Sequence, residues 1–552
     1  MYARVSRRQF GGKSYDYLQL CEAYRNDKGQ PRTRVLANFG RIDHLDRAKV
    51  DSVINGLLKY SSFPEGPRVS ELDHGRVMDY GDILTVVHLW ARLKISEAIA
   101  AHLKDVKAEF DVAGMIQVMV LNRISDPLSK LGVLRWLQTV YIPELKSGSV
   151  QYQHLLRAMD YLLSIKDELE QDLYNELVTL FSPEVDLVYY DLTSTYFEGE
   201  GPELAAHGYS RDHRPDRKQI VLALVVTKEG LPIYHEVLPG NTADVSTLQA
   251  TAQTLATRYR LGRVIIVCDR GMISGDNVEK LEELGLPFII ALRPRNNEEA
   301  QALYQKTLAG FTPVPELGEL IIKETKKEGY RYIQCHNPKV AKETKRNREE
   351  RFKKAAAEVT KLEKRFKNGS VSERDLYHKV QSLLEERGLS RFFEPRIEGD
   401  TIILYRPEEI WEQENYLAGK FFLKTSLDAD RFPSAEVVKS YKQLQTVENA
   451  FRELKDFLKI RPVFHYTDER VRAHVFICVL AYLFERLIEL RCRRASLRHT
   501  GRRALELLSR LKAIECQIGE RRVVLSNRVE EETRRILEAM DIPIPEKIVE
   551  NQ

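Results

Sequence analysis

The sequence has little cysteine, no long hydrophobic run and no apolar leader. Its 552 residues include six cysteines, scattered without a CxxC pair or a cluster of metal-binding type, so neither a disulfide framework nor a zinc site is expected. The start, MYARVSRRQF, lacks the apolar core of a signal peptide. The most apolar stretch, VFICVLAYLF, is too short to cross a bilayer. We therefore expect a protein of the reducing cytoplasm without a membrane partner.

The chain also lacks a large excess of either positive or negative charge. The formal net charge is only +4 because 85 basic residues nearly cancel 81 acidic ones. Hydrophobic residues make up 43% of the chain and charged residues 30%, which is typical of a soluble globular protein. This length allows several domains, so local charge is more informative than the total.

The first 180 residues divide into a β-rich part and a helical part. Residues 1–62 begin with alternating apolar and polar segments, which predict a small antiparallel sheet over 1–45, followed by a short helix. This sheet is rich in Arg and Lys. It can lie on DNA, and a solvated sheet face is an equal alternative. Residues 75–180 have a 3.6-residue apolar period and predict an α-helical domain, either a DNA-reading helix-turn-helix unit or a plain bundle.

Residues 181–295 predict an α/β fold with a mixed sheet. One strand ends in Asp191, a hairpin of two strands follows, and a short apolar strand, expected to be central, ends in Asp269. Helices are expected over 246–259 and 275–284, with a fifth strand after the second helix. The order is β-β-β-α-β-α-β, which predicts a sheet with helices on its faces.

Residues 296–430 interrupt this pattern as an inserted α+β segment. It contains a strand hairpin and then a helical hairpin, whose first helix, 339–368, has 12 Lys/Arg against 5 Asp/Glu. That helix can follow DNA phosphates, and a charged surface helix is an equal alternative. Residues 431–495 return to long helices, and residues 496–552 form a separate C-terminal region.

The stretch YKQLQTVENAFRELK, residues 441–455, predicts one amphipathic helix, with Ser434 as the N-cap of this helical region. At about 100° per residue, Tyr441, Leu444, Glu448 and Lys455 fall within roughly 60° of one another, beside an apolar face. From this stretch alone, a half-buried helix with a solvated edge is the favoured interpretation, and only partners of the acid elsewhere in the chain would overturn it.

Asp191 and Asp269 supply such partners. If their strands are parallel neighbours, the two carboxylates lie side by side at one sheet edge, where α/β sheets place their sites. Paired carboxylates repel unless a cation holds them. Their hard oxygen ligands suit Mg²⁺. A strand-end aspartate alone is more often a turn or helix cap, so the pair and Glu448 together carry the prediction.

These residues resemble the DDE transposases of bacterial insertion sequences, in the branch with the signature Y-x2-R-x3-E-x6-K. Tyr441, Glu448 and Lys455 match the signature, and Leu444 stands where the family has Arg. YYDLTSTYFEG around Asp191, LPGNTADVSTL at 238–248 and VCDRGMIS around Asp269 are also similar to that branch. The resemblance implies an RNase H-like catalytic core formed by residues 181–295 and 431–495.

The resemblance also implies the chemistry. Asp191, Asp269 and Glu448 would bind two Mg²⁺ ions, with Mn²⁺ as a substitute, to cleave a phosphodiester and then join the freed 3′-OH to target DNA. The DNA partners would be the inverted-repeat ends of the element and its target, held by a homodimer in a synaptic complex at the cytoplasmic nucleoid. Further DNA contacts are expected from the following residues: Tyr441, Lys455, Arg270, Arg211, Lys218 and Arg452.

Two rival hypotheses remain. One is an RNase H-like metal nuclease or resolvase that cuts without joining. The other is a catalytically silent DNA-binding relic, for which Leu444 is the only hint. A scaffold protein leaves the paired aspartates unexplained.

Overall fold

The computed structural model describes residues 2–10, 13–26, 29–45, 54, 56, 72–143, 145, 149–181, 187–243, 246–258, 265–269, 275–292, 309–518, 521–545 and 548–551. It divides into two compact units. The first combines residues 1–78, 512–528 and 545–552, and the second combines residues 79–511 and 529–544. Each unit therefore joins segments that lie far apart in the sequence.

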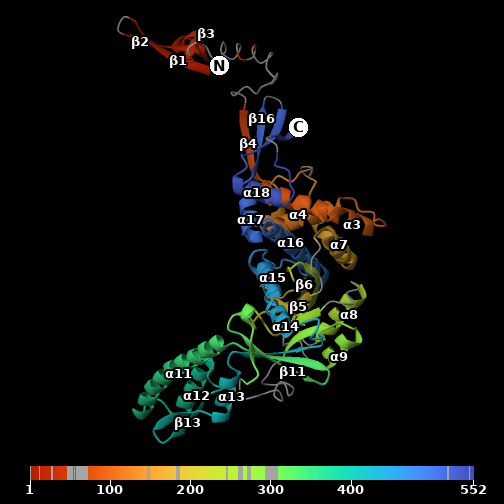
Figure 1. Cartoon of the computed structure of the whole chain (residues 1–552), viewed down its shortest axis with the longest axis vertical. Helices are drawn as coiled ribbons and strands as arrows, with labels where there is room; N and C mark the ends of the chain where they lie inside the picture. The colour runs from red at the N-terminus through yellow and green to blue at the C-terminus, as the bar shows by residue number, and fades with distance from the viewer. Residues whose placement is uncertain are drawn as a thin grey trace. The chain divides into compact units, whose positions relative to one another are not determined.

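The first unit contains the expected N-terminal sheet. Its described strands β1 (Tyr2–Phe10), β2 (Lys13–Arg25) and β3 (Pro31–Arg41) pair antiparallel in that order, which confirms the prediction for residues 1–45 (Figure 1). A second sheet pairs β4 (Leu72–Asp79) with β16 (Lys512–Ile518), β17 (Arg521–Ser526) and β18 (Ile548–Asn551). The helix expected within 46–62 lies almost entirely outside the described residues.

The second unit begins with the predicted helical region. It comprises α2 (Gly81–Arg92), α3 (Ile95–His102), α4 (Val112–Ser125), α5 (Lys130–Trp136), α6 (Tyr152–Ser164) and α7 (Lys166–Phe181). The buried α16 (Asp468–Arg494) packs against α4, α6 and α17 (Gly501–Leu508), and α17 packs against α18 (Glu531–Ala539). The apolar run of α16 is thus the centre of a helical core. Among the described residues, no helix is long and apolar enough to span a membrane.

A large mixed sheet forms the other half of this unit. Its described strands run in the order β10-β11-β12-β15-β9-β8-β5-β6-β7. The bounds of the five strands that the sequence predicts here are β5 (Leu187–Tyr196), β6 (Gln219–Thr227), β7 (Pro232–Pro239), β8 (Ile265–Cys268) and β9 (Phe288–Leu292). Every residue of β6, β8 and β9 is buried, because helices cover the sheet. These include α8 (Leu248–Arg258) and α9 (Gly275–Glu283), whose side chains join the core of the sheet.

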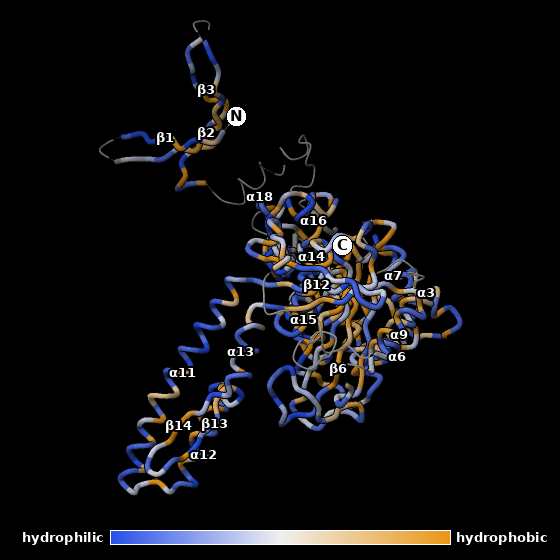
Figure 2. Tube along the Cα trace, turned by 60° about the horizontal axis from the view of Figure 1, so that its bottom comes forward, coloured by the Kyte–Doolittle hydropathy of each residue, from blue (hydrophilic) through white to orange (hydrophobic). Residues whose placement is uncertain are grey.

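Residues 309–425 supply both more sheet and a separate helical hairpin. The strands β10 (Thr312–Pro313), β11 (Ile321–Lys327), β12 (Tyr330–His336) and β15 (Lys420–Thr425) extend the large sheet. The helices α11 (Pro338–Lys367) and α12 (Glu373–Glu386) pack with β13 (Glu394–Glu398), β14 (Thr401–Tyr405) and α13 (Glu408–Leu417) around their own apolar core. Hydrophilic residues predominate along α11 (Figure 2), which confirms the predicted charged helix.

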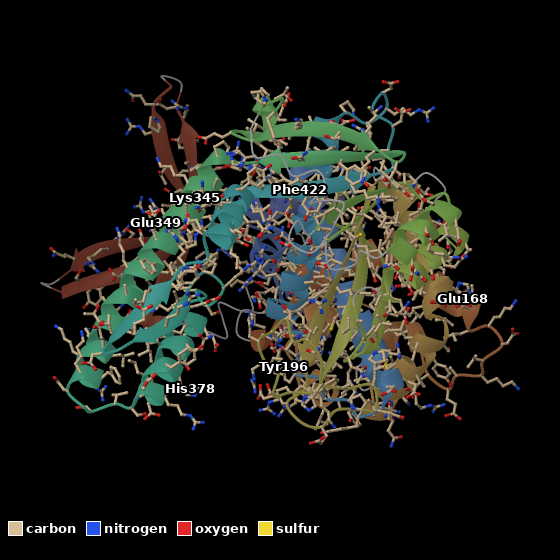
Figure 3. All side chains as sticks on the ribbon, turned by 90° about the horizontal axis from the view of Figure 1, so that it is seen from below. Glu168, Tyr196, Lys345, Glu349, His378 and Phe422 are labelled. Carbon is tan, nitrogen blue, oxygen red and sulfur yellow. The ribbon has the colours of Figure 1, made fainter. Side chains whose placement is uncertain are left out.

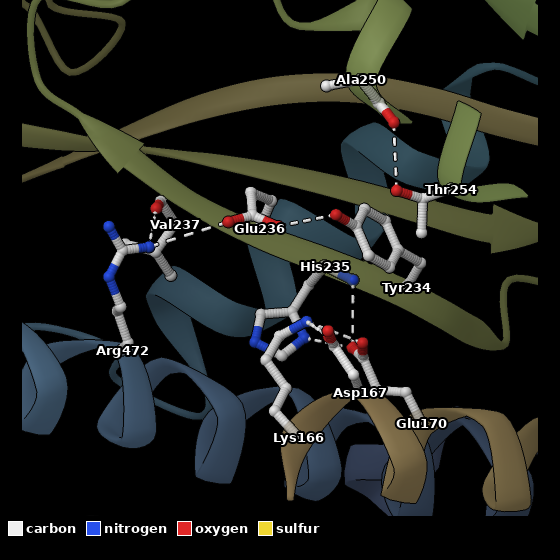
Figure 4. Close-up of polar contacts among 10 residues, drawn as sticks. All are labelled: Lys166, Asp167, Glu170, Tyr234, His235, Glu236, Val237, Ala250, Thr254 and Arg472. Atoms are coloured by element: carbon white, nitrogen blue, oxygen red, sulfur yellow. Dashed lines mark hydrogen bonds and ion pairs between the residues drawn. The ribbon is translucent and has the colours of Figure 1, made fainter. Parts of the chain in front are cut away.

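A buried polar cluster ties α7 to β7 beneath the sheet (Figure 4). The carboxylate of Glu170 contacts Lys166 Nζ at 2.7 Å and His235 Nδ1 at 2.6 Å. Burial tends to raise the pKa of Glu170, but attraction to Lys166 and His235 outweighs it and lowers the pKa below its usual value. The cluster therefore holds a charged carboxylate inside the fold, and it anchors the helical region to the sheet.

Candidate active site

The register of β5 and β8 brings the two predicted aspartates together. The strands are parallel neighbours, and their last pair is Tyr190 with Cys268. Asp191 and Asp269 are the next residues along the chain, so both lie where the pairing of β5 with β8 ends. This confirms the prediction that depended on adjacent, parallel strands.

The prediction that β5 ends at Asp191 is wrong. The strand runs on to Tyr196, because β6 continues to pair with it on the other side, with Asp191 opposite Leu224. Asp191 is therefore a half-buried, mid-strand residue at the point where the pairing with β8 stops. Beyond this point β5 has a neighbouring strand on one side only, and the apolar periodicity of the sequence cannot show this.

The electrostatics of Asp191 support a shared site. Its pKa is raised to about 7, mainly by burial, and the nearby carboxylates of Asp269 and Glu448 contribute to this rise. A hydrogen bond from the Leu192 amide at 2.8 Å and the guanidinium of Arg211 oppose this rise. The three acids from two strands and one helix are thus close enough to interact, and a cation between them would be stabilised.

The helix expected over 441–455 is two helices, α14 (Ser434–Lys442) and α15 (Gln445–Asp456). At the junction the backbone bonds to the third residue back, as in the bond from the Leu444 amide to the Tyr441 carbonyl at 3.0 Å. The side-chain carbonyl of Gln443 accepts a 2.8 Å hydrogen bond from the Tyr189 hydroxyl of β5. The junction is therefore anchored to β5. Ser434 is the first residue of α14, so the N-cap prediction is wrong.

Each matched position of the signature has a definite environment. Glu448 is exposed on α15, which packs against β5 and β6 through its apolar face. The Tyr441 hydroxyl donates to Asp269 Oδ1 at 3.3 Å, and its ring stacks on Phe421 of β15. Leu444 is buried in the core at 6% exposure. The leucine thus packs inward at the position where the family has arginine.

Lys455 belongs to a charged cluster at the far end of β5. Its Nζ contacts Asp212 Oδ1 at 2.9 Å, and Arg461 contacts Asp212 Oδ2 at 2.5 Å. The guanidinium of Arg461 lies 4.5 Å from the ring centroid of Tyr196, the last residue of β5. Figure 3 labels Tyr196. Burial lowers the pKa of Lys455, and Asp212 counters this shift. Asp212 therefore holds two cations next to the sheet.

The remaining predicted DNA contacts are spread more widely. The Arg211 amide donates to Ser194 Oγ of β5 at 3.0 Å, which places this loop beside the acids. Lys218 forms an exposed ion pair with Glu200 at 2.6 Å. Arg452 is exposed on α15 and bonds Asn449. Arg270 lies outside the described residues.

The sequence did not identify three residues that contact the candidate site or its strand: Asp212, Arg461 and Gln443. The polar stripe of the signature gave no signal for them, because two come from loops and one from a helix junction. The spacing of Arg461 six residues beyond Lys455 offered only a weak hint of a second cation at this end of the helix.

The donor set can hold a divalent metal ion, although the side chains are not gathered into a finished site. Within the described part of the chain, no three His, Cys, Asp or Glu residues lie close enough to form a ready-made metal cluster. Burial is the main cause of the raised pKa of Asp191, and repulsion from Asp269 and Glu448 adds to it. A cation would relieve this repulsion, and hard carboxylate oxygens are the ligands that Mg²⁺ prefers. The residues present therefore fit such an ion.

Two family models match the sequence. Residues 187–484 match the family described as transposase DDE domain, and residues 3–66 match the IS1634 family transposase N-terminal domain. The first match spans more than half of the chain and contains all three acids. No curated relative matches the sequence.

Solved structures with a partial likeness are also transposases. A piggyBac transposase synaptic complex with hairpin DNA aligns with TM-score 0.36 and 12% identity, covering 79% of this chain and 82% of that one. A Mos1 transposase paired-end complex with the left transposon end aligns with TM-score 0.15 and 17% identity, covering 45% of this chain and 68% of that one. A Mos1 mariner paired-end complex with Mn aligns with TM-score 0.14 and 16% identity, covering 45% of this chain and 68% of that one. The family membership rests on the two sequence matches.

Proposed function

The chain belongs to the DDE transposase family as an IS1634-type member, an enzyme that cleaves and transfers DNA strands, and we propose that Asp191, Asp269 and Glu448 are its catalytic acids. One observation carries this proposal. The parallel register of β5 and β8 brings the two aspartates to one sheet edge, and Glu448 is close enough to raise the pKa of Asp191.

We assign the catalytic core to the RNase H-like class. Three antiparallel strands, β7-β6-β5, are extended by the parallel strands β8 and β9, and helix α15 packs against β5 and β6. This arrangement is the one that the resemblance implies. Asp191 and Asp269 lie level with the carboxyl end of β8, where α/β sheets commonly carry their sites.

The three carboxylates would hold Mg²⁺, and Mn²⁺ could replace it because both ions prefer oxygen ligands. When bound, paired ions stabilise the attacking and leaving oxygens of an in-line displacement at phosphorus. The protein's own contribution is positioning. The Tyr441 hydroxyl orients the carboxylate of Asp269, and the amide of Leu192 orients that of Asp191.

The proposed reaction has two steps at this one site. Water first cleaves a phosphodiester and frees a 3′-OH at the element end, and that 3′-OH then attacks a phosphodiester of the target. Lys455 and Arg211 would contact phosphates of the bound end, since both lie next to the acids or their strand. Lys218, Arg452 and Arg270 remain proposed DNA contacts further out.

We propose that the partners are the inverted-repeat ends of the element and its target DNA, brought together by a homodimer. This follows from the family chemistry, in which two ends must be joined to one target. The expected place of action is the cytoplasm, at the nucleoid.

The proposal is tested by nicking of a duplex that carries the DNA flanking the gene. Asp191→Ala, Asp269→Ala and Glu448→Ala should each abolish Mg²⁺-dependent nicking and leave duplex binding within about twofold of wild type. Glu453→Ala, which removes another acid of α15, is the matched control and should nick normally. Nicking that survives in any of the three variants would refute the assignment of that acid.

A further inference from the structure

The N-terminal sheet has two chemically different faces. Side chains alternate between faces along a strand, so the register of β1, β2 and β3 assigns each residue to one of them. One face, which we call the arginine face, holds Arg4 and Arg8 of β1, the tyrosines Tyr15 and Tyr17 of β2, and Arg41 of β3. Among the described strand positions, this face contains no Asp or Glu.

The acids of the strands all lie on the opposite face, and each is neutralised there. Asp16 contacts Arg7 at 2.8 Å across the β1–β2 pair, and Glu22 contacts Arg34 at 2.5 Å across the β2–β3 pair. Arg32 is a further arginine on this acid-bearing face, opposite Tyr24. The opposite face is thus nearly balanced in charge, and the arginine face carries the excess of positive charge.

The cations of the arginine face are supported by aromatic rings. The guanidinium of Arg8 lies 5.9 Å from the centroid of Tyr17, and that of Arg41 lies 4.1 Å from the centroid of Tyr15. Arg41 also pairs with Asp43, which lies beyond β3. Arg4 and Arg8 are exposed, and within the described residues no carboxylate contacts either of them. These two arginines therefore remain available to an anionic partner.

We propose that the arginine face binds the duplex DNA of the element end and reads its sequence. A polyanion is the partner that an acid-free arginine surface fits, and guanidinium groups bind both phosphate oxygens and guanine edges. Three strands are about 10 Å across, since neighbouring strands lie 4.7–4.9 Å apart, and the major groove is about 12 Å wide. β-sheets are known readers of DNA grooves.

The proposal rests on the proposed function, because it assumes that the DNA is the end on which Asp191, Asp269 and Glu448 act. It divides the work between the two units of the chain. The first unit would select the DNA, and the second would cut and join it. A failure of either part can be told from a failure of the other.

The experiment compares two double variants of the full-length chain with equal loss of charge. Arg4→Ala/Arg8→Ala changes the arginine face, and Arg7→Ala/Arg32→Ala changes the acid-bearing face. Binding is measured by fluorescence anisotropy with a duplex of the DNA flanking the gene and with a random duplex of equal length. We expect the first variant to lose at least about tenfold affinity for the flanking duplex and most of its preference over random DNA, and the second to lose less than about threefold.

Two further measurements make every outcome informative. Arg4→Lys/Arg8→Lys keeps the charge and the fold but not the planar fork of guanidinium, so it should bind random DNA normally and lose preference for the flanking duplex. Nicking at a DNA concentration above the weakened Kd should persist in Arg4→Ala/Arg8→Ala, since the acids are intact. Equal losses in the two double variants, or a loss of affinity with unchanged preference, would overturn the proposal. Loss of nicking in that variant at saturating DNA would overturn the division of work between the units.

Discussion

Replacing Tyr441 with phenylalanine separates two roles for this residue. The family resemblance assigns Tyr441 to DNA, whereas its hydroxyl donates to Asp269 Oδ1 at 3.3 Å. Its ring stacks on Phe421 with centroids 5.8 Å apart. Tyr441→Phe keeps the ring and its packing and removes only the hydroxyl, so the effect measures the contact with the acid.

The expected size follows from that contact. A hydrogen bond to a charged group contributes about 1.5–3 kcal/mol, but strong bonds from a hydroxyl to a carboxylate are about 2.5–2.7 Å long. The 3.3 Å bond to Asp269 is longer, so we assign it about 1 kcal/mol, which corresponds to a rate factor of about five. We expect the substitution to lower the nicking rate and not the DNA affinity, because Asp269 loses an orienting partner.

The assay is the initial nicking rate of the flanking duplex at increasing Mg²⁺, with duplex affinity measured in parallel. We expect a rate about fivefold lower at limiting Mg²⁺, a partial recovery at high Mg²⁺, and unchanged affinity. Tyr441→Ala should be worse, since it also removes the ring from Phe421. Weaker DNA binding with normal nicking in Tyr441→Phe would refute this reasoning and assign the hydroxyl to DNA.

Three other substitutions test the surroundings of the site. Asp212→Asn should lower the free energy of unfolding by about 1–3 kcal/mol in urea titrations and strengthen random-duplex binding, because it releases Lys455 from its carboxylate partner. Glu170→Gln should cost about 3–5 kcal/mol at pH 7, since it removes the carboxylate from its buried ion pair with Lys166. Because the folded-state pKa of Glu170 is lowered, this wild-type advantage should be full above about pH 5 and shrink as the pH falls below the unfolded value of about 4.3. Leu444→Arg, which restores the family residue, should lower the melting temperature without raising the nicking rate, because position 444 is buried.

Local pattern predicted the strands that carry the aspartates, and the tertiary pairing completed the site. The apolar run before Asp269 gave a central strand, and its parallel pairing with β5 is what the prediction required. The predicted end of β5 at Asp191 was wrong, because pairing with β6 extends β5 beyond the point where β8 ends. How far a strand pairs on each of its two sides depends on contacts between residues far apart in the sequence.

The helix pattern succeeded in its faces and failed in its continuity. Periodicity placed Glu448 correctly beside an apolar face, since the backbone stays nearly helical through the junction. It could not show the break at Gln443, whose anchor is the hydroxyl of Tyr189 on another element. The pairing of β4 with β16, more than 430 residues further along the chain, is likewise invisible to local pattern.

The most direct test of the central claim is strand transfer with pre-cut ends. A duplex that already carries the free 3′-OH bypasses nicking, so joining to plasmid DNA reports the second step alone. One site with three acids predicts that Asp191→Ala, Asp269→Ala and Glu448→Ala all lose joining as completely as nicking, while wild type joins in Mg²⁺. Joining that persists in a variant unable to nick would contradict a single active site formed by these residues.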